Sequence, residues 1–186
     1  MTLRVLLIDD NQDQVTITQK TLKKHHEDCL LDAAATAHDG LAQLKTGGYD
    51  VVLCDYRLPD LSGIEILQQL KASGNHVPFI LVTSMGNERL AVEAMKLGAA
   101  DYVVKDASYD TILPEVIRKA VERFQEKQER ARLAAERDEA VEALKKEKMH
   151  LEAFNKVMMD RERRILDLKR EVNALLAELS RPQKYT

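Results

Sequence analysis

The chain has 186 residues, a formal net charge of −3 and 45% hydrophobic residues, enough apolar material for a globular core. Basic and acidic side chains alternate in its C-terminal part, and no apolar run approaches the length of a membrane span, so we expect neither nucleic acid nor a membrane as a partner. The N-terminal apolar stretch is too short for a signal peptide, and we expect a cytoplasmic protein.

Short apolar runs alternate with longer stretches of helical spacing over the first 108 residues. The intervening stretches repeat apolar side chains every three or four residues, which is typical of amphipathic helices. Strand and helix alternation of this kind predicts an α/β fold, a doubly wound five-stranded parallel sheet covered on both faces. The five runs expected to form strands are Arg4–Ile8, Leu30–Ala35, Val51–Cys54, Phe79–Val82 and Asp101–Val104.

Polar side chains follow the predicted strands at the points where the strands end. Asp9 and Asp10 follow the first strand, and Asp55 follows the third. Thr83 follows the fourth strand, and Lys105 follows the fifth. The carboxyl ends of parallel strands share one edge of the sheet, where ligands of such folds bind. A single strand-end Asp is usually only a turn former, but these groups together indicate a functional site.

The residue types in this set point to phosphate chemistry. Clustered carboxylates repel each other unless a pKa rises or a cation lies among them. Oxygen ligands without His or Cys favour Mg²⁺, which accepts one or two carboxylates together with a phosphate oxygen. Lys105 and Thr83 can bind further phosphate oxygens with a positive charge and a hydroxyl. Asp55 is then the nucleophile, because carboxylates form aspartyl-phosphate intermediates, and we interpret it as a phosphoryl acceptor.

Four segments carry a resemblance to a known family: "IDDN", "LCDYRLPDLSG", "ILVTS" and "GAADYVVK". With them, residues 1–120 resemble the receiver domain of bacterial two-component response regulators, which has a flavodoxin-like fold. The resemblance implies that Asp10, Asp55 and the backbone carbonyl of Arg57 bind Mg²⁺, with Asp9 acting mainly through water. It also implies that Asp55 accepts its phosphoryl group from a sensor histidine kinase or a phosphotransfer protein.

The same resemblance assigns roles to residues after the fourth and fifth strands. Thr83 and Tyr102 match the family's switch pair, in which the hydroxyl moves toward the phosphate and the aromatic ring turns inward. Lys105 matches the phosphate-binding lysine, so the implied catalytic set is Asp55, Thr83 and Lys105. The family often has Pro after that lysine, whereas this chain has Asp106. We therefore expect a trans peptide bond and a different loop there.

Two alternatives to a phosphorylated signalling protein remain. An aspartyl-phosphate phosphohydrolase needs a second Asp two residues beyond the nucleophile, where this chain has Arg57. A structural coiled-coil protein with an unphosphorylated receiver would not need the complete set of polar residues. We expect a signalling module rather than an enzyme. Arg57 and Met85 flank the presumed path of the hydrolytic water and offer no group to orient it, which predicts a phosphoryl lifetime of hours.

The sequence from about Asp110 onward predicts one long helix. It has no Gly after Gly98 and no Pro between Pro114 and Pro182, and its composition is typical of coiled coils. We expect the helix to begin near Asp110, with Pro114 near its first turn. The residues expected to pack on the sheet are Ile112, Val116 and Ile117.

Apolar residues recur every seven positions in residues 121–186, which we assign to a coiled-coil helix that continues from the last receiver helix. We expect this helix to form a homodimer and to pass the signal to a partner or a downstream module. A solvated single helix is the alternative, and the heptads do not by themselves select the orientation of the pair. The a positions are Leu144, Leu151, Met158, Ile165, Val172 and Leu179, and the d positions are Glu147, Phe154, Arg161, Leu168 and Leu175.

Overall fold

The computed structural model describes residues 2–25, 28–84 and 86–178. Strands and helices alternate along the chain, and the five strands are parallel in the order β2-β1-β3-β4-β5. The predicted doubly wound α/β fold is confirmed, and each strand lies within one residue of its predicted ends. The elements are β1 (Leu3–Ile8), α1 (Gln12–His25), β2 (Cys29–Ala34), α2 (Ala37–Thr46), β3 (Val51–Asp55), α3 (Gly63–Ala72), β4 (Phe79–Thr83), α4 (Glu88–Lys96), β5 (Asp101–Val104) and α5 (Tyr109–Glu178).

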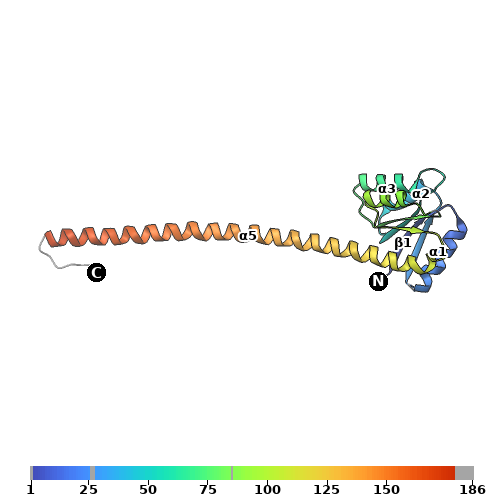
Figure 1. The fold of residues 1–186 in the computed structure, drawn as a ribbon. Coiled ribbons are helices and arrows are strands. Elements are labelled where there is room, and N and C mark those ends of the chain that lie inside the picture. The colour runs from blue at the N-terminus through green and yellow to red at the C-terminus, as the bar shows by residue number, and fades with distance from the viewer. Residues whose placement is uncertain (1, 26–27, 85, 179–186) are drawn as a thin grey trace. The chain divides into compact units, whose positions relative to one another are not determined.

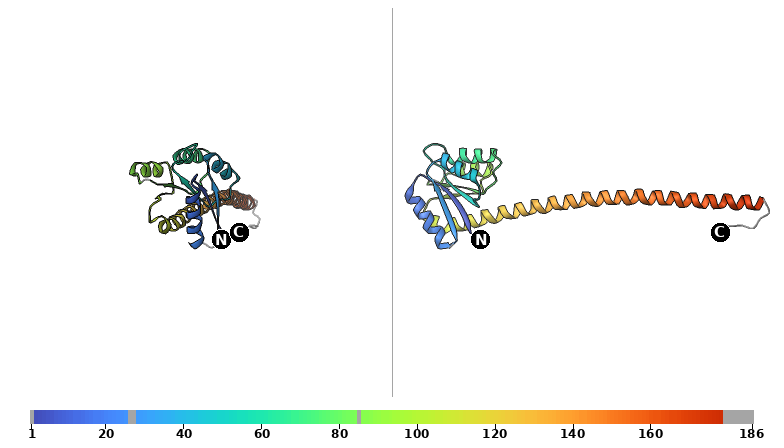
Figure 2. Two further views of the ribbon diagram at one scale, coloured as in Figure 1. Left: turned by 90° about the vertical axis from the view of Figure 1, so that its right-hand side faces the viewer. Right: turned by 180° about the vertical axis from the view of Figure 1, so that it is seen from behind.

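The sheet lies between two layers of helices, with α2 and α3 on one side and α1 and the first turns of α5 on the other (Figures 1 and 2). Successive side chains of a strand point to opposite faces, so both faces of β1 and β3 must be apolar. The side chains facing α2, α3 and α4 are Leu6, Ile8, Val52 and Cys54, and those facing α1 and α5 are Val5, Leu7, Val51 and Leu53.

The order of the strands brings the predicted polar residues to one edge of the sheet. β1 lies between β2 and β3, so the loops that follow β1 and β3 diverge to opposite faces and leave a crevice between them. Ile8 pairs with Cys54 in the register of β1 and β3, which puts Asp9 and Asp55 side by side. Asp55 pairs with Val82 of β4, so Thr83 lies next along the same edge.

Helix α5 begins at Tyr109 and packs its first turns on the sheet. Tyr109, Leu113 and Ile117 are buried because they recur every four residues on one face of the helix. The predicted burial of Ile112 is wrong: this side chain is 45% exposed, since it lies one residue before Leu113 and about 100° around the helix. Val116 packs partly, as expected, against the cluster that holds Ile117.

Pro114 lies farther into α5 than the sequence suggested. It is the sixth residue of the helix, in the second turn rather than the first, and it is buried. A proline at this position cannot donate the hydrogen bond that would reach the carbonyl four residues earlier. The carboxylate of that earlier residue, Asp110, accepts a hydrogen bond from the Thr21 hydroxyl at 2.9 Å, which ties the start of α5 to α1.

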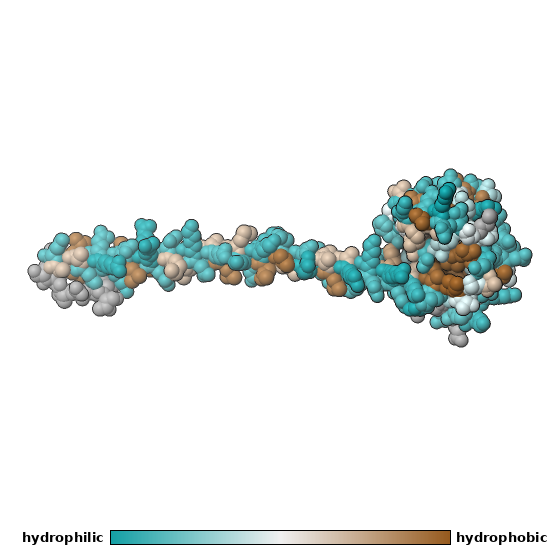
Figure 3. Space-filling model, in the orientation of Figure 1, coloured by the Kyte–Doolittle hydropathy of each residue, from teal (hydrophilic) through white to brown (hydrophobic). Residues whose placement is uncertain are grey.

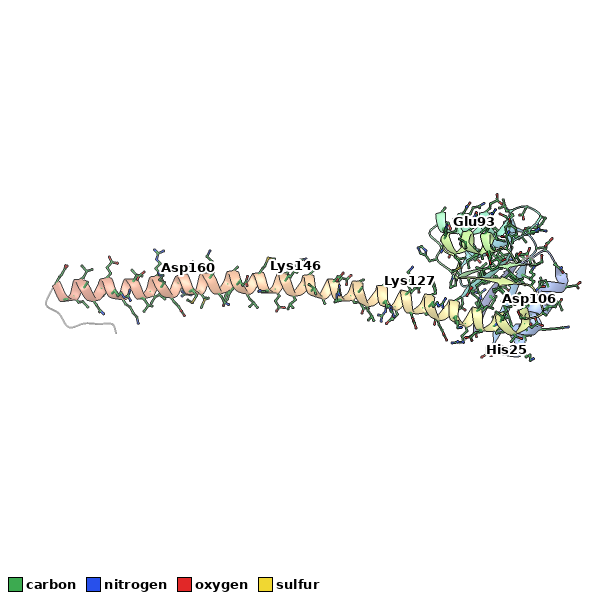
Figure 4. The ribbon with its side chains drawn as sticks, viewed as in Figure 1. His25, Glu93, Asp106, Lys127, Lys146 and Asp160 are labelled. Atoms are coloured by element: carbon green, nitrogen blue, oxygen red, sulfur yellow. The ribbon has the colours of Figure 1, made fainter. Side chains whose placement is uncertain are left out.

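The chain divides into two compact units after Glu129. In the second unit, residues 130–178 are helical throughout, which confirms the long helix; its pairing remains a prediction. Apolar side chains interrupt the polar surface along this helix (Figure 3), while charged residues such as Lys146 and Asp160 point away from it (Figure 4). None of the described helices combines the length and the apolar content that a membrane span requires.

Candidate functional site

The ammonium group of Lys105 joins two buried carboxylates at the carboxyl edge of the sheet. Lys105 Nζ lies 2.7 Å from Asp9 Oδ2 and 2.5 Å from Asp55 Oδ1. Asp9 is 2% exposed and Asp55 is 7% exposed, while the Lys105 side chain is 13% exposed. Each of the three residues stands at the end of a different strand, so the sheet itself brings these groups together.

Backbone groups fix the orientation of both carboxylates. The amide of Arg57 donates to Asp55 Oδ2 at 2.8 Å, and the amide of Asn11 donates to Asp9 Oδ1 at 3.0 Å. Behind Asp55, helix α3 begins at Gly63, where a Cβ atom would lie 2.5 Å from Leu81 Cδ1 and 2.7 Å from the carbonyl oxygen of Asp55. The turn after Asp55 can therefore close only on a residue without a side chain.

The site carries more negative than positive charge within a buried edge. Burial raises the pKa of Asp9 above its usual value, although the hydrogen bond and the charge of Lys105 act against this rise. Burial alone would lower the pKa of Lys105, but its contacts with Asp55 and Asp9 outweigh it and raise the pKa. Lys105 thus stays charged at neutral pH, and one ammonium group serves two carboxylates.

The predicted metal ligands are only partly gathered in this arrangement. Asp10 is exposed beside Asp9, and the side chain of Arg57 is exposed while its backbone amide faces Asp55. Within the described residues, no three His, Cys, Asp or Glu side chains come together as a metal site. In their place, the Lys105 ammonium lies between Asp9 and Asp55.

The predicted switch pair lies on the two strands next to Asp55. Thr83 ends β4 and is 4% exposed, and its carbonyl accepts a hydrogen bond from the amide of Lys105 at 2.7 Å. Tyr102, on β5, is half-buried, and its hydroxyl accepts a hydrogen bond from the amide of Asn87 at 3.2 Å. Asn87 is the N-cap of α4, so the ring of Tyr102 connects β5 with the start of that helix.

The loop after Lys105 has a trans peptide bond, as the sequence predicted. Every peptide bond in the described residues is trans, including the one before Asp106. Asp106 Oδ1 accepts hydrogen bonds from the Ser108 amide at 2.8 Å and the Ser108 hydroxyl at 2.6 Å. This turn leads directly into α5, which begins at Tyr109.

Asp60 is a residue of the site's surroundings that sequence reasoning missed. It lies in the loop after Asp55, and its carboxylate accepts hydrogen bonds from the amides of Ala37 at 2.9 Å and His38 at 3.0 Å. These amides form the start of α2, where a negative charge is favourable, and the bond from Ala37 is the main cause of the lowered pKa of Asp60. The sequence "LPDLSG" shows a turn, but it does not show that this Asp reaches another helix.

The α/β fold, and the contacts of Asp9 and Asp55 with Lys105 at the carboxyl edge of the sheet, define a class of protein. In this class an aspartate at the end of β3 faces a lysine that follows β5. The family model for the response regulator receiver domain matches residues 5–117. The chain belongs to this family. Receiver domains act with a histidine kinase or another phosphodonor, and they generally bind Mg²⁺ for phosphorylation.

Relatives and solved structures agree with this assignment over the first unit. The transcriptional regulatory protein ZraR of Salmonella typhimurium is 36% identical over 117 residues, 63% of this chain and 26% of its own length. The transcriptional regulatory protein PcoR of Escherichia coli is 31% identical over 113 residues, 61% of this chain and 49% of its own. A receiver domain protein from Clostridium thermocellum has a TM-score of 0.60 and 28% identity, covering 66% of this chain and 97% of that one. The chain thus spans about a quarter of the length of the ZraR relatives.

Proposed function

We propose that Asp55 accepts a phosphoryl group from a phosphohistidine of a sensor kinase or a phosphotransfer protein. The observation that carries this proposal is the position of the Lys105 ammonium, 2.5 Å from Asp55 Oδ1, at a buried strand edge. A carboxylate oxygen of Asp55 attacks phosphorus, the phosphorus–nitrogen bond breaks, and the imidazole leaves with the electron pair and takes up a proton. Lys105 then lies where it can hold an oxygen of the new phosphoryl group.

The residues of the site fit Mg²⁺ in charge and in donor type. Two carboxylates share one ammonium group, the burial of Asp9 disfavours its charged form, and Asp10 adds a third carboxylate from an exposed position. We infer that Asp10, Asp55 and the carbonyl of Arg57 hold the ion, with Asp9 acting mainly through water. A bound Mg²⁺ supplies positive charge for the phosphoryl oxygens, beside that of Lys105.

Phosphorylation of Asp55 would change the contacts of Thr83 and Tyr102. Through these changes the signal would pass from the site to the neighbouring elements. Thr83 lies beside Asp55 at the end of the neighbouring strand, within reach of a group bound there. A shift of its hydroxyl toward the phosphoryl group opens space for the Tyr102 ring to turn inward. That turn breaks the 3.2 Å hydrogen bond between the Asn87 amide and the Tyr102 hydroxyl, and so alters the start of α4.

We propose that a homodimeric coiled coil of the second unit passes this signal to a partner or a further module. Apolar side chains at the heptad positions of residues 144–175 are largely exposed in the single chain, including Ile165 at 46% and Leu168 at 53%. A fully buried aliphatic side chain contributes about 1.5–3 kcal/mol, so a few such layers are enough to hold a dimer. Arg161, a charged residue at a d position of the seam, is where we expect the pairing to respond to phosphorylation.

Light scattering tests the dimer. Wild-type protein should have the mass of two chains at tens of micromolar, whereas Ile165→Glu combined with Val172→Glu should give a folded monomer that still accepts phosphate. Met159→Glu is the matched control, because Met159 is 67% exposed and lies one position outside the seam. A wild-type protein that stays monomeric with and without phosphate would contradict the coiled-coil output.

Phosphorylation by acetyl phosphate with Mg²⁺ tests the acceptor and separates the alternatives. The intact mass should rise by one phosphoryl group in the wild type and not in Asp55→Asn, a nearly isosteric change. A protein that never gains this mass would be an unphosphorylated receiver with a structural role. Continuous release of inorganic phosphate over many turnovers would instead favour a phosphohydrolase, against which Arg57 argues because it stands where that enzyme has a second Asp.

A further inference from the structure

The flanks of the distal heptads carry charges in an order that distinguishes the two possible helix orientations. With Ile165 at an a position, Glu162 and Lys169 occupy e positions, and Arg164 and Glu171 occupy g positions. All four are charged residues of the described helix, and none of them forms an ion pair with another described residue. Their charges are therefore available to a second chain.

A parallel, in-register pair places like charges together. In that arrangement a g residue faces the e residue of the next heptad in the other chain, so Arg164 faces Lys169 twice. Arg161, a d residue, faces its own copy inside the seam. Like charges at these positions are unfavourable, and those within the seam are the worse of the two because they are partly removed from water.

An antiparallel pair places opposite charges together. In this arrangement a residue at an a position packs against a residue at a d position of the second copy. Residues at e positions face e positions of the second copy, and residues at g positions face its g positions. When Ile165 packs against Leu168, Glu162 faces Lys169, Arg164 faces Glu171, and two-fold symmetry repeats each pair. In the same register Met158 packs against Leu175. Arg161 then packs against Val172, where its aliphatic stem covers the smaller residue and its guanidinium reaches water.

We propose that the distal helix pairs with a second copy of this chain in the antiparallel orientation, about a two-fold axis between Leu166 and Asp167. This inference rests on the proposed coiled-coil output and specifies its geometry. The overlapping described residues are 155–178, and two chains contribute ten apolar seam side chains, the pairs of Met158, Ile165, Leu168, Val172 and Leu175. Except for Val172, which is half-buried, each of these side chains is at least 40% exposed in the single chain.

The neighbouring antiparallel registers lose the charge match. If one chain slides by one heptad along the other so that the two-fold axis moves toward the N-terminus, Glu162 faces Glu162 and Arg164 faces Arg164. If the chain slides by one heptad in the other direction, so that the axis moves toward the C-terminus, Lys169 faces Lys169 and Glu171 faces Glu171. The charges thus select both the orientation and the register, whereas the apolar positions alone fit several arrangements.

Cysteine cross-linking of the full chain tests the orientation. Met158→Cys and Leu175→Cys are made separately, one of them with a mass tag, and mixed before mild oxidation; the native Cys29 and Cys54 are both buried. The antiparallel pair predicts a disulfide only between the two different variants, since each new thiol lies about 25 Å along the axis from its own copy. A disulfide of each variant with itself, and none between them, would overturn the proposed orientation.

Charge reversal gives a second and independent readout. Lys169→Glu should weaken the dimer by roughly tenfold, because two attractive pairs with Glu162 become repulsive. Adding Glu162→Lys to this variant should restore the wild-type affinity. A parallel pair predicts the opposite, a tighter dimer, since the introduced carboxylate would face Arg164. That result would overturn the antiparallel geometry but leave the coiled-coil output standing, whereas a monomeric wild type would overturn both.

Discussion

Replacement of Lys105 by methionine removes a cation that contacts both buried carboxylates. Methionine keeps a similar length and cannot hydrogen-bond to Asp9 or Asp55, which lose contacts of 2.7 and 2.5 Å. Removing one partner of a buried ion pair typically costs 3–5 kcal/mol. Because the Lys105 side chain keeps 13% exposure at a crevice open to water, we expect about 2–3 kcal/mol at pH 7.5, a large part of the stability of a domain of this size.

Urea denaturation followed by tyrosine fluorescence measures this effect. Four of the five tyrosines lie in the first unit, so the signal reports on the sheet, whereas circular dichroism would be dominated by the long helix. Lys127→Met, an exposed position on α5 (Figure 4), is the matched control and should change the free energy of unfolding by less than about 0.5 kcal/mol.

The pH dependence of the Lys105→Met variant gives the sign of the effect. Without the ammonium group, the pKa of Asp9 rises further above its usual value of 3.8, because the two contributions of Lys105 that lower it are gone. A raised carboxyl pKa stabilises the fold at low pH and loses that contribution as the pH rises through the raised value. The difference in free energy of unfolding between the variant and the wild type should therefore become smaller as the pH falls from 7.5 to 5. A variant as stable as the wild type at pH 7.5, or a difference that grows as the pH falls, would refute the reasoning.

Three further outcomes follow from particular contacts. Gly63→Ala should destabilise the first unit by about 1–3 kcal/mol, whereas Gly86→Ala should be nearly neutral, since a Cβ there meets nothing closer than 4.0 Å. Thr18→Val and Tyr109→Phe should each cost about 1–2 kcal/mol by leaving a buried hydroxyl unpaired, and the double variant should cost less than their sum, because the 3.0 Å bond between them is lost once. Urea denaturation measures the free energy of unfolding of all these variants. Equal losses for Gly63→Ala and Gly86→Ala would contradict the close contacts at Gly63, and a loss in the double variant equal to the sum of the single losses would contradict the bond between Thr18 and Tyr109. The phosphoryl group should persist for hours, as Arg57 offers no group to orient water, and decay within a minute would show that prediction wrong; Met85, the second residue in that prediction, lies outside the described residues.

The fold could be predicted because the spacing of apolar residues along the sequence matches the residues that are buried in the structure. Strands buried on both faces read as continuous apolar runs, and the runs around Val51 and Phe79 have no competing helical pattern. The burial of Ile112 was predicted wrongly because neighbouring apolar residues at the start of a helix leave its rotation undetermined. Only the packing of Tyr109 and Leu113 against the sheet fixes that rotation.

Parts of the site could be predicted because the topology of a parallel sheet places strand ends together. Asp9, Asp55 and Lys105 are adjacent for this reason, although they are 46 and 50 positions apart along the chain. The bridging position of Lys105 could not be read from the sequence, since it depends on side-chain geometry within the crevice. The contact of Asp60 with the start of α2 was missed because it joins a loop to a distant helix, and no local sequence pattern encodes that contact.

The identity of the phosphorylated residue is the most direct test of the central claim. Protein treated with acetyl phosphate and Mg²⁺ is reduced with borohydride, which converts an aspartyl phosphate to homoserine with release of phosphate, and is then mapped by peptide mass spectrometry. The position of Asp55 beside Lys105 predicts homoserine at residue 55 and at no other aspartate. Homoserine at Asp9 or Asp10, or a stable phosphate on a hydroxyl or histidine residue, would contradict the assignment of Asp55 as the acceptor.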